Sequence, residues 1–138
     1  MGRFLLRPKV SYDPSRNPRR PWRVETECVY FTDVPGVARK LVIPRGYETD
    51  LASVPRVPGI YWRYGNTAVL PAIVHDYLYE HDPFKWGRKV ADQIFLEAMR
   101  AEQDPGAATS RWVMYLAVRV GGVRSWRRYR KAQEARNA

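Results

Sequence analysis

Four side chains capable of acid–base chemistry lie at helical spacing in the second half of the chain. His75 and Asp76 are adjacent, Tyr79 follows four residues after the histidine, and Asp92 lies further along. Residues four apart share one face of a helix, so His75 and Tyr79 lie together, whereas Asp76 is turned by about 100°. A carboxylate on one imidazole nitrogen would fix the tautomer and leave the other nitrogen as a base for water. Asp76 would be free to hold a hard divalent cation, which prefers oxygen ligands.

Two helices must bring these groups together. Apolar residues recur at helical spacing over residues 67–81, where Pro71 fits the first turn because its missing N–H is not needed there. A second apolar stripe predicts a helix over residues 85–102. If the two helices pack antiparallel, Asp92 reaches the ring of His75, and Tyr79 braces either of them.

The same residues also allow a purely structural interpretation. A polar cluster that faces a core costs free energy unless its members hydrogen-bond one another or hold a ligand. His75 can be a buried histidine that is satisfied by Asp92 and Tyr79. An enzyme needs an open cleft at His75 and a structural clamp does not, so the exposure of the ring separates the two interpretations.

The pattern His75-Asp76-x-x-Tyr79 followed by Ala91-Asp92-x-x-Phe95 resembles the paired-helix active site of calcium-dependent phospholipases, including the capsid phospholipase domain of parvoviruses. The resemblance covers about 25 residues. It implies that His75 activates water, that Asp76 binds calcium, that Asp92 orients the histidine and that Tyr79 gives support. The glycine-rich calcium loop of that family has only weak counterparts here, at residues 58–61 and 64–66.

A second resemblance covers nearly all of residues 22–122. The string Tyr47-Glu-Thr-Asp-Leu-Ala-Ser-Val-Pro-Arg56, with His75-Asp-Tyr-Leu-Tyr79 and Ala91-Asp92, is similar to a family of small uncharacterised bacteriophage and prophage proteins. The resemblance implies a phage origin and draws Thr49, Asp50 and Ser53 toward the same site.

Within that string, Asp50 in a proline-flanked loop is a candidate third carboxylate for a metal. Thr49, Asp50 and Ser53 can instead be capping and turn residues. Ser53 is not expected to be a nucleophile, because no Gly-x-Ser-x-Gly elbow surrounds it.

The first half of the chain predicts a small sheet. Residues 1–21 are rich in proline and arginine and read as an extended arm or edge segment. Residues 22–31 are rich in β-branched and aromatic residues, which favours a strand, and residues 38–43 give a second strand. The turn signature Asp33-Val-Pro-Gly36 joins the two into a hairpin. Residues 44–59 read as irregular. The fold expected is therefore α+β, with a small N-terminal antiparallel sheet or hairpin followed by three or four helices.

After Asp104-Pro-Gly106, a third helix is expected to begin near Thr109 or Ser110 and to weaken at Gly121-Gly122. The expected organisation is an arm over 1–21, one globular domain over 22–122 and a basic helical tail over 123–138. Basic residues interleaved with aromatics can contact phosphates and stack on bases, or lie on an anionic membrane; a solvated helix packed on the domain is the alternative. Seven tail residues are candidates for nucleic-acid or membrane contact: Arg124, Trp126, Arg127, Arg128, Tyr129, Arg130 and Lys131.

Composition sets outer bounds on these interpretations. The chain has 138 residues, enough for one domain with its own core, and a formal net charge of +10, which favours an anionic partner. The single cysteine, Cys28, excludes an internal disulfide framework and is expected in the core. No stretch of sequence reads as a transmembrane segment or a signal peptide.

Two classes of function are therefore expected. The first is a virion-associated or envelope-acting hydrolase of an ester, with His75 as base and, if metal-assisted, a divalent cation such as calcium. The second is a non-enzymatic virion or assembly protein, such as a tail, neck or capsid accessory, that binds other virion proteins through its basic arms. Either is expected in the host cytoplasm during production and, for a virion component, in the particle.

Overall fold

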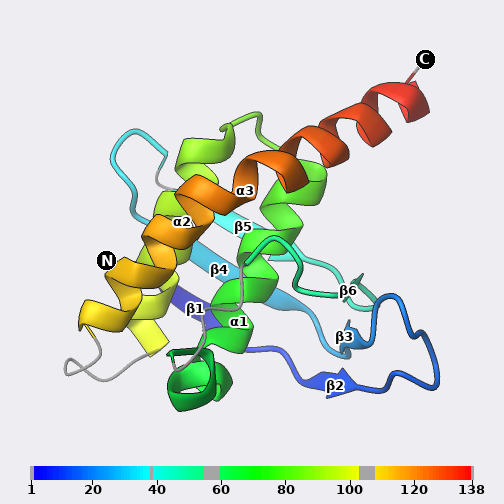
Figure 1. Ribbon diagram of the computed structural model, residues 1–138, viewed down its shortest axis with the longest axis horizontal. Helices are drawn as coiled ribbons and strands as arrows, with labels where there is room; N and C mark the ends of the chain where they lie inside the picture. The colour runs from blue at the N-terminus through cyan, green and yellow to red at the C-terminus, as the bar shows by residue number, and fades with distance from the viewer. Residues whose placement is uncertain (1, 38, 55–59, 103–107, 138) are drawn as a thin grey trace.

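The computed structural model describes residues 2–37, 39–54, 60–102 and 108–137. In this part of the chain, six short strands precede three helices, and the α+β class expected from the sequence is confirmed (Figure 1). The strands form two separate three-stranded antiparallel sheets. The first two helices pack on the first of these sheets and the third packs on that helix pair, so the polar residues of the pair face the interior.

The first sheet consists of β1 (Arg3–Leu6), β4 (Cys28–Thr32) and β5 (Arg39–Ile43), in the order β1-β4-β5. Alternate residues of its strands face the helices and are buried, as the two-residue period of a strand requires. The predicted turn joins β4 to β5: the N–H of Val37 donates to the carbonyl of Val34, and Gly36 adopts a φ of 85°. The hairpin expected from the sequence is therefore confirmed over its described residues, which exclude residue 38.

The second sheet consists of β2 (Val10–Tyr12), β3 (Trp22–Val24) and β6 (Glu48–Thr49), in the order β2-β3-β6. The single strand expected over residues 22–31 is thus wrong, because residues 22–24 and 28–32 belong to different sheets. Of the two interpretations of residues 1–21, an extended arm or an edge segment, the described residues fit the edge segment. β1 and β2 supply the edge strands of both sheets, and their backbone groups find partners there.

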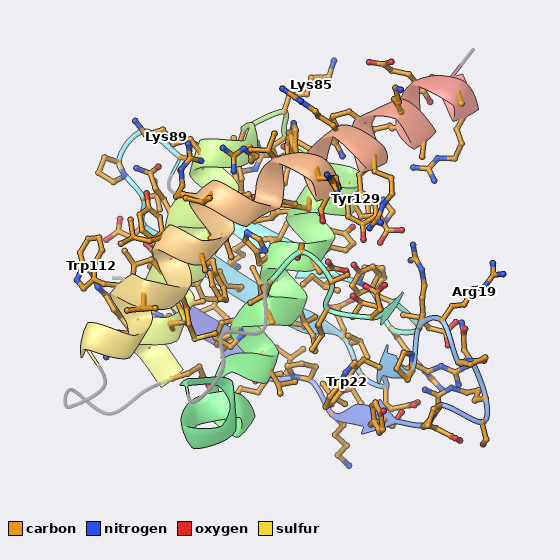
Figure 2. All side chains as sticks on the ribbon, viewed as in Figure 1. Arg19, Trp22, Lys85, Lys89, Trp112 and Tyr129 are labelled. Carbon is orange, nitrogen blue, oxygen red and sulfur yellow. The ribbon has the colours of Figure 1, made fainter. Side chains whose placement is uncertain are left out.

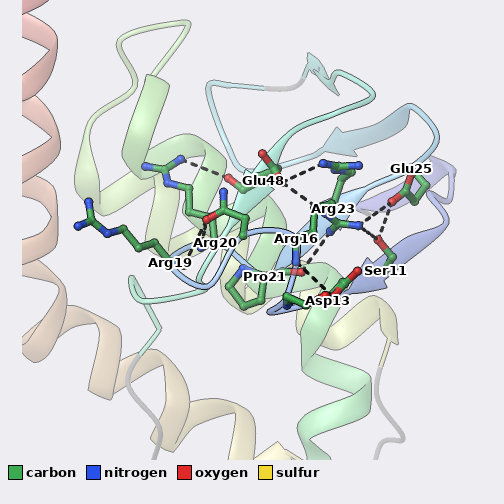
Figure 3. A network of polar contacts seen from close by, with 11 residues as sticks. Ser11, Asp13, Arg16, Arg19, Arg20, Pro21, Arg23, Glu25 and Glu48 are labelled. Carbon is green, nitrogen blue, oxygen red and sulfur yellow. Dashed lines mark hydrogen bonds and ion pairs between the residues drawn. The ribbon is translucent and has the colours of Figure 1, made fainter.

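The loop between β2 and β3 is fixed by charged contacts (Figure 3). Arg16 donates to the carbonyl of Pro21 and pairs with Glu48 on β6. Arg20 donates to Glu80 on the first helix at 2.8 Å. The prolines exclude a helix here, and the arginines connect the loop to the body of the protein.

The three helices are α1 (Ile60–His81), α2 (Arg88–Glu102) and α3 (Ala108–Asn137). α1 begins earlier than expected, and Pro71 lies inside it rather than in its first turn. α3 continues through Gly121-Gly122 to Asn137, so the expected weakening of the helix at the two glycines is wrong. The predicted break at residues 104–106 lies outside the described residues.

The core lies between the first sheet and the α1–α2 pair. Tyr30, Leu41 and Ile43 of the sheet pack against helix residues that include Ile73 and Ile94. A second cluster joins α2 to the first half of α3 through Phe95, Met99, Met114 and Val118. Burial of each such side chain contributes about 1.5–3 kcal/mol, so these contacts hold α1 and α2 at a fixed separation.

None of the helices as described is both long and apolar enough to cross a bilayer.

Candidate functional site: a buried histidine network

The centre of the site is a contact between α1 and α2. The Nε2 atom of His75 lies 2.7 Å from Oδ1 of Asp92. A carboxylate only accepts hydrogen bonds, so Nε2 carries the proton and the tautomer of a neutral ring is fixed. The sequence predicted this contact across the helix pair, and the prediction is confirmed.

Tyr79 braces the same carboxylate. Its hydroxyl donates to Oδ1 of Asp92 at 2.6 Å, and its ring lies against the ring of His75 with centroids 4.2 Å apart. Burial raises the pKa of Tyr79 and the negative charge of Asp92 adds to the rise, so the phenol remains a donor. The contact expected of Tyr79 is therefore present, and its supporting role in catalysis stays a prediction.

Two arginines bind the second oxygen of Asp92. Arg119 of α3 donates to Oδ2 at 2.8 Å, and Arg88 of α2 approaches it at 3.4 Å. Burial alone would raise the pKa of Asp92, but hydrogen bonds from His75, Tyr79 and Arg119 outweigh it and hold the pKa below its ordinary value. Asp92 is therefore an ionised carboxylate, although its side chain is completely buried.

Ser53 completes a chain of hydrogen bonds. Its Oγ atom lies 3.0 Å from Nδ1 of His75, and because Nε2 carries the proton, Nδ1 accepts from the hydroxyl. Ser53, His75 and Asp92 thus form a continuous relay from the loop after β6 through α1 to α2. The sequence drew Ser53 toward the site without assigning it a partner, since no local pattern encodes a contact over 22 residues.

Asp76 lies beside the relay in a separate set of contacts. Its carboxylate accepts hydrogen bonds from the hydroxyls of Thr49 and Tyr47 and from the N–H of Ser53. The Tyr47 hydroxyl also lies 3.1 Å from Glu80, so one phenol is shared between two carboxylates. Burial and these two negative charges raise the pKa of Tyr47 well above its ordinary value.

The described residues offer no set of ligands for the cation that was expected at Asp76 and Asp50. Asp50 accepts the N–H of Ala52 at 2.9 Å, which is the turn role that the sequence allowed as an alternative. Among the described residues, no group of three or more His, Cys, Asp or Glu side chains is placed to share an ion. Of the weak calcium-loop counterparts, residues 58 and 59 lie outside the described residues and residues 60–66 belong to α1.

The histidine, its serine partner and the two aspartates are closed to solvent, whereas the two arginines at Asp92 are partly exposed. His75 and Asp92 are 0% exposed, and Ser53 and Asp76 are 1% exposed. Both ring nitrogens and both oxygens of Asp92 are bound by protein groups. A water molecule or substrate therefore finds no free position on the imidazole in this conformation.

The seven basic-tail candidates divide into two groups on α3. Arg124, Arg127, Arg128 and Lys131 are exposed. The other three face inward, which corrects the expectation that they contact a partner: Tyr129 is buried (Figure 2), Trp126 packs edge-on against Tyr79, and Arg130 donates to the carbonyl of Glu80 at 2.9 Å. Their positions are set by packing on α1, which a local sequence pattern does not reveal.

The central part of the chain matches a protein-family model. Residues 22–118 fit the model of a family described as "Protein of unknown function (DUF1353)". The chain belongs to the DUF1353 family. The matched segment of this DUF1353 protein contains Ser53, His75 and Asp92, whereas Arg119 and the basic half of α3 lie beyond it. No curated protein and no solved structure matches the chain.

Proposed function

We propose that this DUF1353 protein is a bacteriophage-encoded, non-enzymatic virion or assembly component in which the buried histidine network clamps the fold. The observation that carries the proposal is the complete burial of His75, with both ring nitrogens bound by protein groups. The phage origin is supported by the resemblance of the Tyr47–Arg56 string and of His75–Tyr79 to small phage proteins.

The clamp joins four parts of the molecule. Ser53 comes from the loop after β6, His75 from α1, Asp92 from α2 and Arg119 from α3. A buried polar group that loses its partner costs about 1–3 kcal/mol, because its hydrogen bond to water is not restored. The network therefore favours one mutual arrangement of the helices over others.

Substitution of His75 tests the proposal. His75→Ala removes the partners of Ser53 and Asp92, and we expect it to lower the free energy of unfolding by about 2–4 kcal/mol, from unsatisfied polar groups and the cavity left behind. The measurement is equilibrium denaturation followed by circular dichroism. His81→Ala is the matched control: His81 lies at the end of α1, and we expect its loss to cost less than about 1 kcal/mol. A His75→Ala protein as stable as the parent would contradict the clamp.

One observation favours a second function, the ester hydrolase. Ser53, His75 and Asp92 form a continuous series of contacts, and in a neutral ring whose Nε2–H donates to Asp92, Nδ1 faces the Ser53 hydroxyl as an acceptor. Hydrolysis requires that the groups covering His75 move aside and that a water molecule or substrate replace the Ser53 hydroxyl.

Activity assays distinguish the two functions. The purified protein is tested on phospholipids and on cell-envelope polymers, with and without a divalent cation such as calcium. No turnover is expected if the network is a clamp. Turnover that disappears in His75→Ala and in Asp92→Asn, while the folded fraction is verified by circular dichroism, would establish the hydrolase and overturn the clamp as the network's main role.

A further inference from the structure

The outward face of α3 carries three large apolar side chains in water. Trp112 is 48% exposed, Leu116 is 57% exposed and Val120 is 81% exposed, at intervals of four residues. Figure 2 shows Trp112 at the margin of the molecule, beyond the packed interior. Single exposed apolar residues are ordinary on a protein surface, but an aligned series marks an interaction site.

Cationic residues continue the same face. At about 100° per residue, Trp112, Leu116, Val120, Arg124, Arg127 and Lys131 all fall within an arc of roughly 120°. The last three of these residues are cations and are exposed. One acidic residue, Glu134, is exposed on the same arc. The outer surface of α3 is thus apolar in its first half and mainly cationic in its second.

A hollow lies where the two halves meet. It has a volume of about 530 Å³ and is lined by Val120, Gly121, Val123, Arg124 and Arg127. Gly121 contributes no side chain, which leaves room between the valines and the two arginines. Apolar walls beside guanidinium groups suit a ligand that joins an anionic group to hydrocarbon.

We propose that the outer face of α3 binds an anionic lipid surface, with Trp112, Leu116 and Val120 at the acyl boundary and Arg124, Arg127 and Lys131 on the headgroups. The inference goes beyond the proposed function, because it rests on α3 alone and does not depend on the role of His75. A straight helix presents a convex face, which a planar lipid surface can contact along its length.

Other partners fit this face less well. Nucleic acid would use the cations but would leave the apolar series in water, and the tail aromatics that could stack on bases, Trp126 and Tyr129, pack inward on the domain. A second copy would bring two cationic faces of a chain with a net charge of +10 together.

Vesicle binding by the full chain tests the proposal. The protein is mixed with vesicles of phosphatidylcholine alone, or of phosphatidylcholine with phosphatidylglycerol, and bound protein is separated by flotation. We expect binding to the anionic vesicles and little binding to the neutral ones, with the bound fraction falling as salt screens the charges. Absence of binding to anionic vesicles at low salt would overturn the proposal.

Two variants locate the contact. Leu116→Ser with Val120→Ser should weaken binding to anionic vesicles by about tenfold or more, whereas Val42→Ser, at an exposed apolar residue of β5, should leave it unchanged. Replacing Arg124, Arg127 and Lys131 by Gln should weaken binding by roughly a hundredfold, since each cation contributes about fivefold. The charge-matched control replaces three exposed cations of the N-terminal half: Arg19, Lys40 and Arg45.

Each outcome has a defined consequence. Equal weakening by both charge variants, with no effect of the serine substitutions, would show attraction by net charge alone and overturn the proposed face. Binding to a short oligonucleotide or to an acidic peptide, but not to anionic vesicles, would assign the face to that other partner. Circular dichroism of every variant confirms that the helices are retained.

Discussion

At the residue scale, Asp92 controls the chemistry of the site. It is a buried carboxylate that accepts hydrogen bonds from His75, Tyr79 and Arg119, and its charge decides which nitrogen of the imidazole carries the proton. Buried charges are tolerated only when they are paired and hydrogen-bonded, and Asp92 meets both conditions. The neighbouring Asp76 is satisfied by neutral donors instead, the hydroxyls of Thr49 and Tyr47.

The lowered pKa of Asp92 predicts a pH dependence of stability. Because the pKa is lower in the folded than in the unfolded chain, the carboxylate contributes stability that is complete above the unfolded value of about 4. This contribution is lost as the pH falls through the lower folded-state pKa. Asp92→Asn should therefore be less stable than the parent at neutral pH, and the difference should shrink in acid. Urea unfolding measured from about pH 7 down to about pH 3 checks this.

The control for that titration is Glu27→Gln, which makes the same acid-to-amide change at an exposed position. Its unfolding free energy should follow the parent across the whole pH range. If Asp92→Asn kept the acid dependence of the parent, the loss of stability in acid would come from other carboxylates, and the role assigned to Asp92 would be wrong.

At the element scale, the contact of α3 with α1 depends on a glycine. A Cβ atom at Gly122 would collide with the hydroxyl of Tyr79, the same group that braces Asp92. Further along α3, Arg130 donates to the last carbonyls of α1 and so caps that helix. α3 therefore closes the site on one side and contacts the rest of the domain from Met114 to Gln133.

Gly122→Ala should destabilise the protein in spite of the better helix propensity of alanine. We expect a loss of about 1–3 kcal/mol, because Tyr79 must move and its bond to Asp92 is strained. Gly121→Ala is the matched control at the neighbouring exposed position, where alanine should add about 0.5–1 kcal/mol. Thermal unfolding of the two variants gives the comparison. Equal effects of the two substitutions would show that α3 does not pack closely at this point.

The helices illustrate what periodicity can and cannot predict. The apolar stripes predicted the existence of α1 and α2 and the end of α1, although α1 begins at Ile60 rather than at Thr67. The turn at Asp33–Gly36 was predicted from its residue types. The end of α3 was not predicted, because a pair of glycines lowers helix propensity locally but a buried contact, here with Tyr79, outweighs the loss. The division of residues 22–31 between two sheets was also missed, since strand propensity does not specify a strand's partner.

At the scale of the whole molecule, two small sheets and three helices enclose one polar network within an apolar core. The N-terminal strands complete both sheets, and Arg16 and Arg20 of the β2–β3 loop reach Glu48 and Glu80. Positive charge that is not used in this way remains on the surface, most of all along the second half of α3. The arginines of the β2–β3 loop thus stabilise the fold, whereas the exposed cations of α3 can contact a partner.

Cys28 reports on the integrity of this core. It lies on β4 and is buried, and burial raises the pKa of its thiol to about 12. We expect a disulfide reagent at about pH 8 to modify the native thiol at least about a hundredfold more slowly than the denatured one. The reaction is followed by absorbance, with one thiol per chain in guanidinium as the reference. Rapid modification of the native protein would show that the first sheet opens readily.

The sequence by itself determined the α+β class, the two central helices and the pairing of His75 with Asp92. These features depend on local periodicity and on side chains that a helix pair brings together. Tertiary structure alone decided that Ser53 and Arg119 join the network, that Trp126, Tyr129 and Arg130 turn inward, and that the imidazole is closed to water. The physical reason is that burial and long-range partners depend on how whole elements pack, and packing is not encoded in the spacing of any single segment.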